Sequence, residues 1–215
     1  LIVDNAQAGG GGARSFIPCH PFSMHCGINH NKDRCAFPAF IPFDGVATEH
    51  GVPEGVAVDK PGNIYVSVNV AGGGDQIWKF APSGEKSVLV DFGAPGLACG
   101  LAVDAIGNVY AAQPVVPVHG VFRVDREGNA VLLPGTEQII GGNALAFDQR
   151  GTLYVTESFS FDGSGNYALG GIWQIPKGGT ATLWLRHELL TGVYPDIMGA
   201  SYGANGIGFY HGSLY

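Results

Sequence analysis

Charged side chains are scarce in this chain. Lys, Arg, Asp and Glu make up 13% of its 215 residues, and 11 basic against 18 acidic residues leave a formal net charge of −7. Proteins that bind nucleic acid present a basic patch to the phosphates, and the sequence shows none. Long apolar runs are lacking too, since none approaches the roughly 20 residues of a membrane-spanning helix. We therefore expect neither a nucleic-acid partner nor a membrane span.

Glycine, by contrast, is abundant. The chain has 35 glycines, and 11% of its residues are aromatic. So much glycine argues against a helical bundle, because glycine in a helix interior costs about 1 kcal/mol relative to alanine. So many aromatic residues argue against a disordered chain. Many short strands joined by glycine turns fit both observations, so we expect an all-β fold.

A short strand motif recurs about every 45 residues. It reads Gly55-Val-Ala-Val-Asp59, Gly100-Leu-Ala-Val-Asp104 and Ala144-Leu-Ala-Phe-Asp148, and a tight turn containing glycine follows each copy. Three further strands with alternating apolar residues follow each time. The second strands are predicted at 64–67, 109–112 and 153–156, the third at 76–80, 120–124 and 171–175, and the fourth at 86–90, 130–133 and 181–185.

Four antiparallel strands per repeat predict the blades of a β-propeller. Residues 51–215 hold three such blades, and Asn205-Gly-Ile-Gly-Phe209 opens a fourth, which makes about three and a quarter. Propellers have roughly 4–8 blades and close into a ring, so we expect a chain incomplete at its C-terminus, from a protein of about six blades. Residues 1–50 are interpreted as an irregular segment, rich first in Gly and then in Cys and His.

Two sets of recurring residues are interpreted as structural. Aromatic residues recur at one position of the third strand and are expected to pack between blades. Aspartates recur at the end of the first strand and are expected to bond the backbone amides of the turn that follows. The aromatic set is Trp78, Phe122 and Trp173, and the aspartate set is Asp59, Asp104 and Asp148.

Four cysteines are present, three of them within the irregular segment. An even number suits disulfides in an oxidising compartment, and the sequence does not choose among the three possible pairings. We therefore expect an extracellular or periplasmic protein. Three histidines alternate with the first three cysteines, but the spacing matches no Cys-x₂-Cys zinc pattern, so disulfides are favoured over zinc. These residues are Cys19, Cys26, Cys35 and Cys99, with His20, His25 and His30.

The residue just before the first strand of each blade is expected at one mouth of the central channel. Those positions hold Glu54, Cys99, Asn143 and Asn205. One carboxylate and two carboxamides are hard oxygen ligands that suit Ca²⁺, which predicts a metal site of Glu54, Asn143 and Asn205. The alternative is that these are ordinary turn residues. The thiol of Cys99 is a poor ligand for a hard cation, so it is expected to pack or to form a disulfide.

These opening residues also carry a family resemblance. Pro53-Glu54-Gly55, Gly142-Asn143-Ala-Leu and the Asn-Gly motif at Asn205 resemble the blade openings of the regucalcin/gluconolactonase (senescence-marker-protein) family. That family comprises six-bladed propellers related to paraoxonase and strictosidine synthase. The resemblance implies that Glu54 and Asn205 are metal ligands and that Asn143 is a ligand or a substrate contact. It also implies a general-base Asp in a blade beyond Tyr215.

The leading functional hypothesis is a calcium-dependent hydrolase of a lactone or related ester, acting on a small-molecule substrate. His119, which precedes a third strand, is a candidate general base because a histidine pKa lies near working pH; the alternative is a solvated loop histidine. A non-catalytic NHL-like binding propeller and a strictosidine-synthase-like lyase or synthase stay open as functions. The oligomeric state also stays open.

Overall fold

The fold is an all-β arrangement of four-stranded antiparallel blades, as the repeat predicts. A computed structural model of the chain describes residues 51–69, 74–93, 97–114, 119–158, 170–191 and 203–215. The chain divides into two units, Leu1–Phe40 and Ile41–Tyr215, and every described residue belongs to the second. The predictions for residues 1–50, including Cys19, Cys26, Cys35 and their neighbouring histidines, lie outside the described residues.

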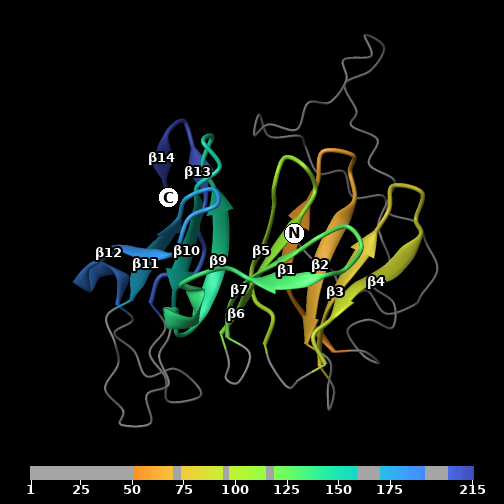
Figure 1. The fold of residues 1–215 in the computed structure, drawn as a ribbon, viewed down its shortest axis with the longest axis horizontal. Helices are drawn as coiled ribbons and strands as arrows, with labels where there is room; N and C mark the ends of the chain where they lie inside the picture. The colour runs from red at the N-terminus through yellow and green to blue at the C-terminus, as the bar shows by residue number, and fades with distance from the viewer. Residues whose placement is uncertain (1–50, 70–73, 94–96, 115–118, 159–169, 192–202) are drawn as a thin grey trace, which may run out of the picture. The chain divides into compact units, whose positions relative to one another are not determined.

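Three sheets have their strands in chain order, each strand pairing with the next. Figure 1 shows each blade as an antiparallel meander. The first blade holds β1 (Val52–Val58), β2 (Ile64–Asn69), β3 (Asp75–Phe80) and β4 (Lys86–Asp91). The second holds β5 (Leu101–Val103), β6 (Val109–Gln113), β7 (Gly120–Val124) and β8 (Ala130–Leu132). The third holds β9 (Gly142–Phe147), β10 (Leu153–Glu157), β11 (Gly171–Ile175) and β12 (Thr182–Arg186).

A fourth, two-stranded element opens the next blade. It pairs β13 (Phe209–Tyr210) with β14 (Ser213–Leu214). Short 3₁₀ turns, η2 (Thr136–Gln138) and η3 (Glu188–Leu190), lie in two of the connections between blades. No helix among the described residues has the length and apolar character needed to cross a membrane.

The recurring aspartates bond the turns, as predicted. Oδ1 of Asp104 accepts the amides of Ile106 and Asn108, and Oδ2 accepts the hydroxyl of Tyr110 at 3.2 Å. Asp59 and Asp148 bond the amides of their own turns in the same way. The aspartate therefore ties the end of the first strand to the start of the second, and the Tyr of the second strand adds to this tie in the first two blades.

The second blade packs on both of its neighbours. Alternate residues of β6 face opposite sides, so Val109 and Ala111 join a buried cluster with Tyr65 of the first blade. Ala112 belongs to a second cluster that contains Leu145 and Trp173 of the third blade. The prediction that the recurring aromatic residue packs in the core is confirmed for Trp173, which is 8% exposed.

Adjacent blades approach closely at their opening strands. The amide of Gly100 donates to the carbonyl oxygen of Asn143 at 2.7 Å. A Cβ at Gly100 would collide with that oxygen, and one at Gly55 would collide with the carbonyl oxygen of Cys99. Glycine at these two positions lets consecutive opening strands touch through their backbones.

Substituting Gly100 tests this close approach. We expect Gly100→Ala to lower the free energy of unfolding by about 1–3 kcal/mol, because overpacking at a rigid contact forces the backbone to shift. Chemical denaturation of the full chain measures the change. Gly208→Ala is the matched control, since nothing lies within 4 Å of a Cβ there. A Gly100→Ala protein as stable as the control would contradict the contact.

Candidate functional site

The four opening positions differ in exposure. Glu54 lies on β1 and is exposed, whereas Asn143 on β9 is 7% exposed. Cys99 precedes β5 and is 1% exposed, and Asn205 precedes the fourth blade and is exposed. Glu54 and Asn205 are therefore available to solvent, whereas Asn143 is buried.

Each opening residue after the first is tied to the preceding blade through its carbonyl oxygen. The hydroxyl of Ser67 donates to the carbonyl of Cys99, and the hydroxyl of Thr156 donates to the carbonyl of Asn205, both at 2.7 Å. The second blade has Ala112 at this position, and there the amide of Gly100 reaches the carbonyl of Asn143 directly. These contacts tie the opening residue of each blade to the blade before it.

The two hydroxyls also form hydrogen bonds within their own blades. Ser67 Oγ accepts the amide of Gly55 at 2.7 Å, and Thr156 Oγ1 accepts the amide of Ala144 at 3.0 Å. Each hydroxyl thus bridges the opening strand of one blade and the opening residue of the next. These residues were not predicted from the sequence. A Ser or Thr within a strand looks like any other strand residue, and the equivalent position in the second blade holds alanine.

Cys99 is a free, buried thiol, so of the two predictions for it, packing holds and a disulfide does not. Burial, together with the nearby carboxylates of Glu54 and Asp75, raises the pKa of the thiol to about 12. It therefore stays protonated at neutral pH and is a poor ligand for a hard cation. Because the charge of the Glu54 carboxylate contributes to this raised pKa, Glu54 lies near the opening of the second blade.

The three predicted ligands are of the chemical type that a hard cation prefers. No group of three or more His, Cys, Asp or Glu side chains suited to a metal occurs in the described part of the chain. Glu54, Asn143 and Asn205 instead offer one charge and two neutral oxygens, which is a calcium-type set and not a zinc-type set. That the three meet around one ion stays a prediction.

His119 directly precedes β7 and is half-buried. Its Nε2 lies 2.8 Å from the carbonyl oxygen of Glu137. Because a carbonyl only accepts, this contact places the proton on Nε2 and leaves the lone pair on Nδ1 of the neutral ring. Nδ1 is buried and has no hydrogen-bond partner. This contact ties His119 to the connection that leads into the third blade. The choice between a general base and a solvated loop histidine stays a prediction.

Three buried polar residues at this end of the blades were not predicted. Gln113 is 1% exposed with an unpartnered Nε2, and Asp75 is 2% exposed with an unpartnered Oδ2. Glu157 is 5% exposed and forms an ion pair with Arg186 at 2.7 Å. For Gln113 and Glu157, the signal available in the sequence was a polar residue at the end of an apolar second strand, as in Val109-Tyr-Ala-Ala-Gln113. Asp75 begins a third strand and had no such signal.

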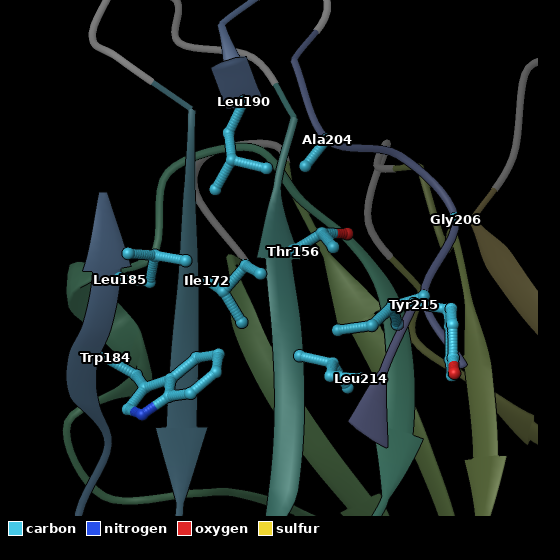
Figure 2. Close-up of a pocket in the computed structure, with 10 residues that line it drawn as sticks. Thr156, Ile172, Trp184, Leu185, Leu190, Ala204, Gly206, Leu214 and Tyr215 are labelled. Atoms are coloured by element: carbon cyan, nitrogen blue, oxygen red, sulfur yellow. The ribbon is translucent and has the colours of Figure 1, made fainter. Parts of the chain in front are cut away.

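An apolar pocket of about 290 Å³ lies between the third blade and the β13–β14 hairpin (Figure 2). Ile172 and Leu185 line one side and Leu214 the other. The lining is almost entirely apolar and offers few polar groups to orient a ligand, so we do not assign a ligand to this pocket.

The hydroxyl bridge is testable by removing the hydroxyl alone. We expect Thr156→Val to cost about 1–3 kcal/mol of unfolding free energy, because Ala144 N and Asn205 O lose their partner while the shape is kept. Urea denaturation of the full chain provides the measurement. Thr182→Val, on the exposed strand β12, should change stability by about 0.5 kcal/mol or less. Equal effects of the two substitutions would show that the bridge contributes nothing.

Comparisons with known proteins agree on the fold. No protein-family model and no curated protein match the chain. A nidogen/laminin complex structure aligns with a TM-score of 0.53 and 15% identity, over 75% of this chain and 54% of that one. A Xanthomonas campestris gluconolactonase aligns with a TM-score of 0.51 and 18% identity, over 77% of this chain and 61% of that one. A Staphylococcus aureus virginiamycin B lyase aligns with a TM-score of 0.47 and 15% identity, over 68% of this chain and 46% of that one. The chain thus spans about half to three fifths of these chains. The likeness to the nidogen/laminin structure and to the gluconolactonase shows a β-propeller.

Proposed function

We propose that the protein is a calcium-dependent hydrolase of a lactone or related ester. The observation that carries the proposal is the set of oxygen-bearing side chains at repeat-equivalent positions, Glu54, Asn143 and Asn205. The carbonyls of the two asparagines are fixed by the preceding blades. The fold shared with a gluconolactonase supports the same reaction class.

The three side chains have distinct roles in this proposal. Glu54 supplies the negative charge that holds a divalent cation, and it is exposed to solvent, from which a substrate would enter. Asn143 is nearly buried, so its amide has few alternative positions and is suited to orient a substrate as well as to bind a metal. A bound calcium would supply stabilisation of the negative charge that develops on the carbonyl oxygen during hydrolysis.

His119 is the proposed general base. A base needs a lone pair, and the bond from Nε2 to the carbonyl of Glu137 leaves the lone pair on Nδ1. A water that reached this atom would lose a proton to it as it attacked the ester carbonyl. The general-base Asp that the family resemblance implies would take this role instead if the protein contains one beyond Tyr215.

Removing the carboxylate at the mouth is the main test. We expect Glu54→Gln in the full chain to abolish calcium binding and to lower kcat/KM on a panel of γ- and δ-lactones at least about 100-fold, because the electrostatic stabilisation of the oxyanion is lost. Isothermal titration with Ca²⁺ and a lactone hydrolysis assay measure the two effects. Glu85→Gln, an exposed turn residue at the other end of its blade, is the control. Unchanged turnover after Glu54→Gln or after chelation would reject the mechanism.

The second candidate is a non-catalytic propeller that binds a protein. The aligned nidogen/laminin structure is of a complex and has the same fold, so the architecture serves binding equally well. Calcium titration separates the two candidates. A folded protein that binds no calcium at the mouth and hydrolyses no lactone fits the binding module.

A further inference from the structure

Two directly opposed residues of the first blade each carry a buried acceptor oxygen without a donor. Asn69, at the end of β2, and Asp75, at the start of β3, are directly opposed in the strand ladder. The Cβ atoms of such a pair lie about 5 Å apart on one face of the sheet. Oδ1 of Asn69 and Oδ2 of Asp75 are both buried, and neither has a hydrogen-bond partner. Two opposed oxygens of this kind are unfavourable unless a proton lies between them.

This face of the first blade meets the second blade. Ile77 lies two residues after Asp75 on the same strand, and it packs in a cluster with Leu101 of β5. The backbone amide of Ala98 lies next to the Asp75 carboxyl, where it favours the ionised form and lowers the pKa. Asp75 therefore bridges the first blade and the segment that leads into Cys99.

The charges around Asp75 disfavour its ionised form. Asp91, at the end of β4, adds repulsion, and the neutral thiol of Cys99 lies on the side of the second blade. Glu54 of β1 lies near that thiol as well. Among the described basic side chains, none stabilises the carboxylate. Burial, which outweighs the bond from Ala98, raises the pKa of Asp75 from 3.8 to about 6.

We propose that Asp75 and Asn69 form a proton-dependent clasp on the segment leading into the second blade. The protonated Asp75 carboxyl donates to Oδ1 of Asn69, while the amide of Ala98 lies next to the same carboxyl. Ionisation removes the donor and leaves two oxygens opposed in a buried place, which loosens the segment around Ala98 and Cys99. The clasp stands independently of the proposed hydrolase, since it concerns the packing of two blades.

The direction of the pH effect follows from the raised pKa. When the segment opens, the carboxyl meets solvent and regains its ordinary pKa, so ionisation favours the open form. The closed clasp is most stable below about pH 4, weakens between pH 4 and 6, and changes little above that. A difference of about two pKa units sets the limit at about a 100-fold increase in the opening equilibrium.

Hydrogen exchange of the full chain between pH 4 and 8 tests the clasp, with rates corrected for the intrinsic pH dependence. We expect the amides of residues 97–100 to lose protection, by up to about 100-fold, as the pH rises through 4–6. Asp75→Asn keeps the shape and supplies a permanent donor to Asn69, so it should retain the low-pH protection up to pH 8. Asn69→Ala removes the acceptor and should shift the loss of protection to lower pH.

Asp125→Asn is the control. Asp125 caps the turn after β7, and hydrogen bonds from Asn129 lower its pKa, so this substitution should leave the response of residues 97–100 unchanged. The proposal is overturned if Asp75→Asn follows the wild-type pH curve, or if Asn69→Ala leaves its midpoint in place. It is also overturned if protection rises with pH, because the amide of Asn69 would then donate to an ionised carboxylate.

Discussion

The structure depends on how the opening residue of each blade is bonded to the blade before it. Backbone carbonyls near the axis are partly buried, and an unpaired buried carbonyl costs about 1–3 kcal/mol. The chain meets this constraint in two ways. Ser67 and Thr156 insert a hydroxyl between blades, whereas Gly100 lets the backbones touch directly. Both solutions fix the carbonyl of the next opening residue, and so they fix the positions of Cys99, Asn143 and Asn205 relative to the preceding blades.

Packing between blades follows from the same arrangement. Each interior face of a blade needs a neighbour, and β6 supplies small residues, Ala111 and Ala112, to the faces on its two sides. Small residues let the blades approach closely enough for the bonds at the opening strands to form. The faces that no described blade covers remain apolar, with Val52 62% exposed on β1 and Trp184 47% exposed on β12. These exposed side chains are apolar, and the lining of the pocket beside Leu214 is apolar as well.

The sequence predicted what is local and periodic. The strand following Asp104, its glycine turn and the Tyr that returns to the aspartate repeat with fixed spacing, so the blades could be read directly. The contacts between blades could not be predicted in this way, because equivalent positions hold different residue types. These positions are Ser67, Ala112 and Thr156. Asp75 was missed for a related reason, since its partner Asn69 is defined by strand register. Register is a property of the folded sheet that a single sequence does not display.

Two carboxylates near one thiol show how the fold separates functions. Glu54 and Asp75 both act on Cys99, yet the first is exposed and the second is 2% exposed. An exposed carboxylate can be reached by a cation or a substrate from solvent, whereas burial without a counter-ion makes Asp75 hold its proton to a higher pH than an ordinary carboxyl. The position of each carboxylate in the blade therefore sets its chemistry.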